Sequence, residues 1–171
     1  MVEFAVSIPI LLTMLFAMVN IGVLITDKVS AAYAARQGAR LAANLGDGTA
    51  SNLTTSQIDS NVCQAVLASA AHLAYATVTE IDIYQADTGT TNGAFDGTQP
   101  HDSYAVVNGS CNLLGTLGFP AGATGSRKQS TPNETSIGVR MLWTYIAPTG
   151  FQSFSLNLSD YTVMKATAVI T

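Results

Sequence analysis

The chain begins with an apolar segment long enough to cross a lipid bilayer. No Asp, Glu, Lys, Arg or His occurs from Phe4 to Thr26, a run of 23 residues. In a helix that rises ~1.5 Å per residue, the run spans about 34 Å, compared with about 30 Å for the hydrocarbon core of a bilayer. It exceeds the apolar core of a cleavable signal peptide, and no basic residue stands before it in this sequence. We therefore expect a membrane-spanning helix.

The helical pattern continues beyond this apolar segment. Residues 27–45 contain good helix formers and no proline, and Gly38 is the one weak interior position. We expect the helix to end near Gly46, because glycine is favoured just after a helix. Pro9 removes one backbone hydrogen bond and predicts a local bend or an irregular first turn. Many small side chains in the outer half favour close packing against other helices: Ala31, Ala32, Ala34, Ala35, Ala39, Ala42 and Ala43.

The remainder of the chain predicts a small α+β domain. Thr54 with Gln57 forms a capping-box pattern that begins a second helix. Alternating or β-rich segments then predict three or four strands in mostly antiparallel order. We divide the chain into an N-terminal helix over residues 1–45 and a globular α+β domain over residues 46–171. The expected strands are Val78–Ala86, Tyr104–Val107, Ile137–Ala147 and Thr162–Ile170.

The charge content argues against nucleic acid as a partner. Only 11% of the residues are charged and the formal net charge is −4. Binding to phosphates needs clustered Lys and Arg, and the seven basic residues are scattered or at most paired. So low a charge content also indicates that another chain, lipid or glycan covers part of the surface.

The sequence contains no recognisable catalytic or metal-binding pattern. Asp87–Thr88–Gly89 spells the aspartic-protease triplet, but such an enzyme needs two aspartates, so we interpret it as a turn. His72 and His101 have no Ser or Cys partner at a known spacing. We therefore expect no enzyme activity, no cofactor and no metal. The loop acids could gather around calcium but lack EF-hand spacing: Asp82, Asp87, Asp96 and Asp102.

Two cysteines, Cys63 and Cys111, are far apart in the sequence. Two thiols without histidine at ligand spacing make a poor metal site. In an exported domain they predict one disulfide that closes a loop of about fifty residues, worth roughly 3–4 kcal/mol. Two buried free thiols are the alternative.

Four Asn-x-Ser/Thr acceptor sequences make the chain a candidate glycoprotein. Such sequences also arise by chance in a chain rich in Ser and Thr. The mass of the intact mature protein would distinguish these interpretations. The candidate glycosylation residues are Asn52, Asn108, Asn133 and Asn157.

The N-terminal residues resemble a known family. Glu3–Phe4, Pro9 among aliphatic residues, and the phrase Gln37–Gly38–Ala39–Arg40 are similar to the TadE-like pilins and pseudopilins of the tight-adherence (Flp-type) branch of type IV filaments. The resemblance is specific over residues 1–45, loose over residues 137–171 and absent between them.

This resemblance implies a structural role. Such a subunit is made as a precursor in the inner membrane, trimmed by a prepilin-type peptidase, and moved by an inner-membrane assembly platform into an extracellular filament of its own copies. It implies helix–helix packing by Tyr33, Arg36, Gly38 and Arg40. In the family, the acid usually lies two positions farther from the new N-terminus, after a cleaved glycine. No glycine precedes Met1 here, so either the given chain lacks its true first residues, which we favour, or processing differs.

The resemblance and the charge pattern together make Glu3, with Phe4 and Pro9, the expected assembly site. As an ordinary N-terminal acid, Glu3 would interact favourably with the helix dipole by about 0.3–1 kcal/mol. In a filament core it would instead pair with the N-terminal amine of a neighbouring subunit. An unpaired buried charge penalises every wrong arrangement, so this pairing would fix the register of the helices.

The expected function is therefore that of a structural subunit of a Tad-like pilus, which could be the main subunit, a minor pilin or a tip initiator. The alternative is a membrane-anchored binding domain or adhesin that never polymerises. The alternative predicts that Glu3 is dispensable and that shearing leaves the protein with the membranes. An anchored hydrolase would need a partner chain to complete its site.

Overall fold

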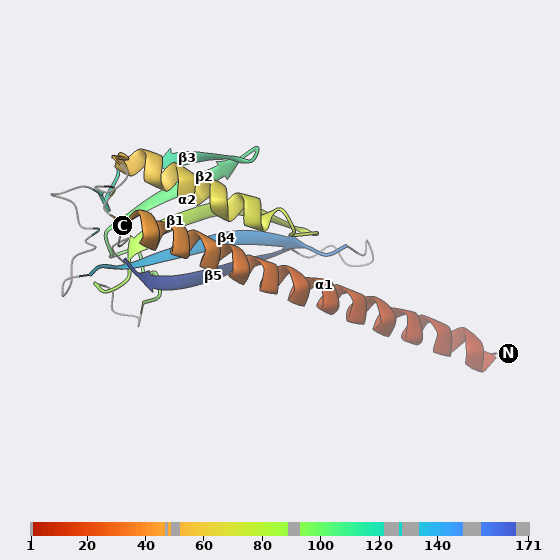
Figure 1. The fold of residues 1–171 in the computed structure, drawn as a ribbon. Coiled ribbons are helices and arrows are strands. Elements are labelled where there is room, and N and C mark those ends of the chain that lie inside the picture. Colours follow the sequence, from red (N-terminus) through yellow and green to blue (C-terminus); the bar gives the residue numbers. More distant parts are fainter. Residues whose placement is uncertain are drawn as a thin grey trace.

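The structure is a computed structural model of the chain. It describes residues 2–46, 48, 52–88, 93–121, 127, 134–148 and 155–166, and for residues 2, 3, 5 and 6 it describes the backbone alone. Two helices cover one face of a five-stranded antiparallel sheet, and the first helix projects far beyond the sheet (Figure 1). The elements are α1 (Val2–Leu45), α2 (Thr55–Ala70), β1 (Ala76–Gln85), β2 (His101–Val107), β3 (Ser110–Leu114), β4 (Ser136–Ile146) and β5 (Ser155–Lys165).

Helix α1 is continuous across Pro9 and ends as the sequence predicts. Gly46 follows Leu45 with a positive φ of 45°, a conformation that glycine adopts at little cost. Its N–H donates to the carbonyl of Ala42 (2.9 Å), which satisfies one of the last carbonyls of the helix.

The predicted capping box starts α2. The backbone N–H of Gln57 donates to the hydroxyl of Thr54 (3.4 Å), and the N–H of Thr54 donates to the side-chain oxygen of Gln57 (2.9 Å). Two donors that the helix itself cannot satisfy are thereby paired. The face of α2 that carries Ile58, Val62 and Val66 is fully buried.

The sheet has the order β3-β2-β1-β4-β5, and all its pairings are antiparallel. The α+β fold class predicted from the sequence is confirmed, and the described residues form five strands where the sequence predicted three or four. Helix α1 contacts β4 and β5, and α2 contacts β1 and β3. The core lies between the helices and the sheet and includes Ile81, Val139, Met141 and Trp143.

Three details of the strands differ from the prediction. β3 was not predicted, because Ser110–Leu114 is short and mostly exposed and so carries no strong burial pattern. The last strand lies at Ser155–Lys165 instead of Thr162–Ile170, and residues 167–170 lie outside the described part of the chain. A bulge at Thr79 interrupts the alternation in β1, so Val78 and Ile81 both face the core. Asp82 and Tyr84 are also buried, Asp82 beside Arg140 and Tyr84 beside Phe95.

Candidate assembly site on the first helix

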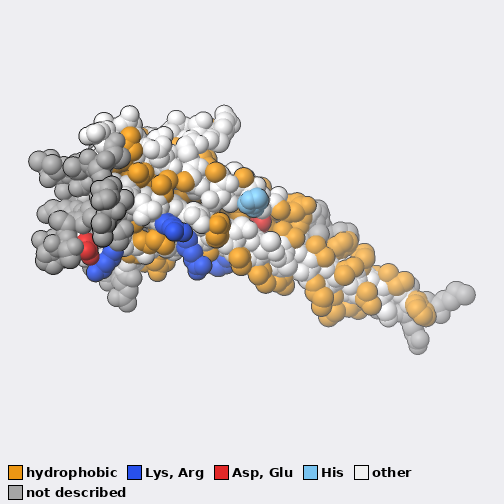
Figure 2. All heavy atoms as spheres, viewed as in Figure 1, with side chains coloured by type: hydrophobic (Ala, Val, Ile, Leu, Met, Phe, Trp, Pro, Cys, Tyr) orange, Lys and Arg blue, Asp and Glu red, His pale blue; other side chains and the backbone are white. Residues whose placement is uncertain are grey.

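The N-terminal half of α1 presents large apolar side chains to its surroundings in all directions. Ile10, Leu11 and Leu12 are consecutive, so their side chains point about 100° apart around the helix, and they are 56%, 69% and 41% exposed. Figure 2 shows this arm as a rod covered with apolar side chains that extends away from the domain. The helix is long and apolar enough to cross a membrane. A soluble domain does not leave so large an apolar surface uncovered, so lipid or other protein chains must cover it.

The globular domain first holds α1 at Asn20 and Asp27. The hydroxyl of Tyr145 on β4 donates to the carbonyl of Asn20 (3.1 Å). The buried carboxylate of Asp27 accepts hydrogen bonds from the backbone N–H groups of Ala74 (2.9 Å) and Tyr75 (3.1 Å). Asp27 thus fastens the segment between α2 and β1 to α1, a role that its position next to the apolar run did not indicate.

One apolar stripe continues along α1 after the domain begins. Ile21, Ile25, Val29 and Tyr33 recur every four residues and are 57%, 58%, 65% and 55% exposed. Residues spaced by four lie on one face of a helix, so they extend the apolar surface of the arm along the outside of the domain. Arg36 and Arg40 follow on this face and are also exposed.

The residues expected to act in helix packing have two different environments. Tyr33, Arg36 and Arg40 are exposed, and no ion pair of the described residues includes either arginine. Gly38 is buried at the contact of α1 with α2, where an added Cβ would collide with Val66. Its lack of a side chain therefore allows packing within the subunit.

The structure places the predicted assembly residues at the start of α1. Phe4 is exposed and Pro9 lies within the helix. Glu3 belongs to α1, and its side chain lies outside the described part of the structure. The role of Glu3 remains a prediction.

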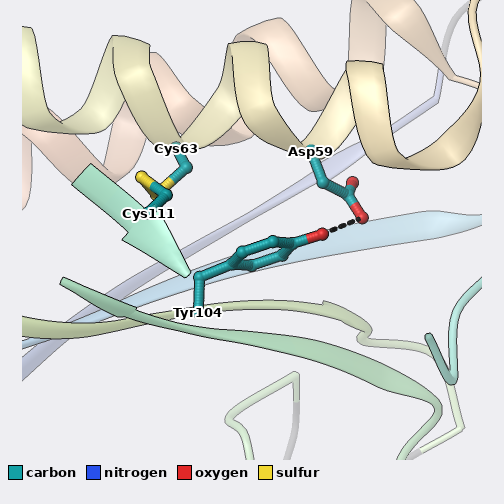
Figure 3. Close-up of a disulfide and its surroundings, with 4 residues drawn as sticks. All are labelled: Asp59, Cys63, Tyr104 and Cys111. Carbon is teal, nitrogen blue, oxygen red and sulfur yellow. Dashed lines mark hydrogen bonds between the residues drawn. A yellow bond between two sulfur atoms is a disulfide. The ribbon is translucent and has the colours of Figure 1, made fainter. Parts of the chain in front are cut away.

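Cys63 and Cys111 form a disulfide that joins α2 to β3 (Figure 3). Their Cα atoms are 6.4 Å apart, within the usual range. Of the two alternatives left by the sequence, the structure contains the disulfide. Because β3 is an edge strand, this bond attaches one border of the sheet to the helical layer.

Three of the four candidate glycosylation residues lie in the described part of the chain, and each of these is exposed. Asn52 and Asn108 have positive φ angles of 52° in turns, and the side chain of Asn157 on β5 accepts a hydrogen bond from Thr144 (2.9 Å). Asn133 lies outside the described residues.

A buried ionic cluster, which the sequence analysis missed, lies under α2. The Arg127 guanidinium donates to Asp59 through Nη1 (2.5 Å) and Nη2 (3.0 Å), and through Nη2 to Asp102 (2.7 Å). All three side chains are fully buried. Tyr104 donates a further hydrogen bond to Asp59 (3.1 Å), as Figure 3 shows. Asp59 lies on the apolar face of α2. An acid on an apolar helix face was the one feature of the sequence that could have indicated a buried ion pair.

Two carboxylates share one guanidinium in this cluster, so its charges do not cancel. The pKa of Asp59 is raised from 3.8 to about 6, chiefly because burial away from water outweighs the lowering by Arg127, with a smaller contribution from nearby Asp102. Asp102 is held by the N–H groups of Gly118 (2.6 Å) and Phe119 (3.0 Å). The cluster fastens chain segments far apart in sequence.

Of the other polar residues considered as candidate site residues, Asp82 and His101 have hydrogen-bond partners within the domain. Asp82 accepts hydrogen bonds from Arg140 (2.7 Å) and Ser103 (2.5 Å), and the Arg140 guanidinium lies 4.1 Å from the centre of the Phe95 ring. His101 begins β2, with Nδ1 2.7 Å from the carbonyl of Gln99. His72, just after α2, is exposed. Two of the four acids considered for calcium, Asp82 and Asp102, are therefore in separate ion pairs with arginine.

Comparison with known proteins finds a similarity over most of the first helix. Residues 1–40 match the model of a family described as TadE-like protein. The resemblance predicted from the N-terminal residues is thereby confirmed over this range. A search of the curated proteins and a search of the solved structures found no match.

Proposed function

We propose that the chain is a structural subunit of an extracellular Tad-like pilus and that it polymerises through α1. The premise of this proposal is the match of residues 1–40 to the TadE-like family. The match itself indicates a Tad pilus-associated protein, and the apolar helix fits a membrane-anchored one. The proposal goes beyond this match in three points: polymerisation, the extracellular location and the role of Glu3.

The exposed stripe on α1 is the observation that carries this proposal. A hydrocarbon layer of ~30 Å covers about 20 helical residues, so a layer that begins at Phe4 ends near Val23. Val29 and Tyr33 lie one to three turns beyond that point, yet each is more than half exposed. Lipid tails do not reach these side chains, whereas the helix of a second subunit, shifted along the filament axis, would cover them.

The driving force for such assembly differs from simple burial of apolar surface. Before assembly, the arm of α1 is surrounded by lipid tails, which are as apolar as its own side chains. Helix association then depends on van der Waals packing and on polar pairing. Among the exposed positions on α1, Gly22 has no atom within 4 Å of an added Cβ, which leaves room for a close neighbour.

In this proposal Glu3 pairs with the N-terminal amine of a neighbouring subunit and sets the register. The partners are copies of the chain in the filament, membrane lipid before assembly, and a prepilin-type peptidase with an inner-membrane platform during biogenesis. The precursor lies in the inner membrane and the filament on the cell surface. We propose no enzymatic role, because the buried acids and their arginines hold the fold together.

Substitution on the stripe tests the proposal with a matched control. Val29→Glu places a charge in the expected contact, and Val107→Glu places the same charge on β2, away from α1, at a valine that is also about half exposed (65% and 52%). We expect Val29→Glu to abolish filaments in the sheared extracellular fraction, by electron microscopy and mass spectrometry. Val107→Glu should keep them. Equal filament yields from the two variants would contradict the role of the stripe.

Glu3→Ala tests the register residue. We expect normal expression and membrane insertion with no filaments. Normal filaments from this variant would exclude the proposed pairing but leave the stripe intact. If the unmodified protein itself stays with the membranes after shearing, the anchored binding domain or adhesin becomes the better description.

A further inference from the structure

The end of the domain from which α1 projects carries a group of exposed apolar side chains. Tyr75 is 46% exposed, Ile146 55% and Leu156 39%. We call these three residues the rim. The N–H of Ile146 donates to the carbonyl of Tyr75 (2.8 Å), and Leu156 pairs with Tyr145, next to Ile146 in β4. Figure 1 shows the end of α2 and the end of β4 on this side of the domain.

The hydrogen bonds to α1 determine how deep the rim lies along the helix. Tyr145, adjacent to Ile146, is bonded to the carbonyl of Asn20, and the backbone of Tyr75 is bonded to Asp27. The rim is therefore level with residues 20–27 of α1. A hydrocarbon layer of ~30 Å that begins at Phe4 ends near Val23, within this interval. When α1 spans a bilayer, the rim is held at the bilayer surface.

The chemistry of the rim suits that position. A shallow depression beside it is lined by uncharged residues alone: Ala74, Tyr75, Ala76, Thr77, Ile146, Ala147 and Pro148. Tyrosine is enriched where the headgroups meet the acyl chains, because its ring is apolar and its hydroxyl polar. Lys28, exposed on α1 just beyond this level, is placed to meet lipid phosphates.

We propose that the rim is a lipid-contacting surface that seats the domain on the bilayer before assembly, with Tyr75 and Ile146 between the headgroups and the acyl chains. The inference rests on the membrane-anchored precursor of the proposed function and does not need polymerisation. Lipid is the occupant because α1 and the hydrogen bonds at Asn20 and Asp27 hold the rim at the depth of the lipid surface. The rim would limit tilting of the domain relative to the membrane.

Tryptophan fluorescence in vesicles tests this inference on the full chain. Tyr75→Trp and Ile146→Trp report on the rim, and Leu11→Trp reports on the inserted arm. Leu114→Trp is the matched control, since Leu114 is 48% exposed. Strand pairing places it level with Arg140, six residues or about 20 Å from Ile146 along β4.

Each variant is reconstituted in phosphatidylcholine vesicles with or without bromine on the acyl chains near the headgroup. The unmodified protein, whose Trp143 is buried, supplies the blank. After the emission of the unmodified protein is subtracted, we expect bromolipid to reduce the emission of the introduced tryptophan at least twofold in Leu11→Trp and in both rim variants. The emission of the introduced tryptophan in Leu114→Trp should change by no more than about 10%.

Quenching at Leu11 but not at the rim would overturn the inference while leaving membrane anchoring intact. Absence of quenching at all positions would overturn it together with anchoring. A rim tryptophan that shifts to shorter wavelength only in sheared filaments, without quenching in vesicles, would assign the rim to a protein neighbour and overturn the lipid contact. Loss of filaments in the Val29→Glu experiment is independent of these outcomes.

Discussion

The guanidinium of Arg127 binds the carboxylate of Asp59 through two nitrogens, and both side chains are fully excluded from water. The two residues are 68 positions apart in the chain. Arg127 also donates through Nε to the carbonyl of Phe119 (2.8 Å) and lies 4.7 Å from the centre of the Phe119 ring. One side chain therefore joins α2, the start of β2 and the segment after β3.

Removal of this arginine should cost much of the stability of the domain. Arg127→Ala leaves Asp59 and Asp102 buried without their cation, and loss of one partner from a buried pair costs about 3–5 kcal/mol. We expect a decrease of that size in the free energy of unfolding, measured by urea denaturation. The control Lys165→Ala, at an exposed position, should change it by less than about 0.5 kcal/mol. A similar small effect at Arg127 would contradict the importance of the cluster.

The same cluster predicts a pH dependence of stability. The pKa of Asp59 is raised from 3.8 to about 6 by burial, so between these values the folded state binds a proton that the unfolded state releases. The resulting stabilisation is complete below pH 4 and is lost as pH rises through about 6. We expect Asp59 to contribute a fall of up to about 3 kcal/mol from pH 4 to pH 7. Asp59→Asn should remove this component of the urea-denaturation profile; an unchanged profile would refute the assignment.

The disulfide should stabilise the domain by limiting the unfolded chain. Cys63 and Cys111 are separated by 48 residues, for which the chain-entropy model gives about 4 kcal/mol. We expect the Cys63→Ala/Cys111→Ala variant to lose stability of that order in urea. Adding reductant should lower the stability of the unmodified protein and leave the variant unaffected. If reductant affected both proteins equally, the disulfide would not be the cause.

Two glycines of the same helix should respond in opposite directions to alanine. At Gly38 an added methyl group collides with Val66, and overpacking of this kind costs about 1–3 kcal/mol. At Gly22 nothing lies within 4 Å, so Gly22→Ala gains helix propensity of up to about 1 kcal/mol. Thermal unfolding of the domain should show a clear decrease for Gly38→Ala and no decrease for Gly22→Ala. Similar decreases in both would contradict the packing difference.

The Gly22→Ala variant also distinguishes an effect on assembly from an effect on folding. Because Gly22 is beside the exposed stripe, Gly22→Ala tests whether the proposed neighbour approaches closely there. We expect reduced filament yield with no loss of domain stability. Unchanged filament yield would place the neighbouring helix elsewhere along α1.

Features that depend on neighbouring residues in the sequence were predictable. The absence of charge from Phe4 to Thr26 defined the apolar arm, and glycine at position 46 defined the end of α1. The Thr54–Gln57 pair defined the start of α2. Each feature reflects local hydrogen bonding or hydropathy, which the order of residues largely determines.

Features that depend on contacts between distant segments required the tertiary structure. Asp59, Asp102 and Arg127 carry no common motif, and they meet only because α2 packs over the sheet. Asp27 is the first charged residue after the apolar run, and folding buries it against the backbone of Tyr75. A charged residue shows in sequence only that it must be solvated or paired; which partner it finds depends on the packing of the whole domain.

The sequence by itself therefore determined the apolar arm, the α+β class and the TadE-like character of the first forty residues. Only the tertiary structure decided which side of α1 remains uncovered. Packing of α2 and the sheet buries Ala31, Ala35 and Gly38 and leaves Val29 and Tyr33 exposed, although all five residues lie in the same helix. Hydropathy describes how much apolar surface a segment has, whereas its contacts decide which part of that surface remains for a partner.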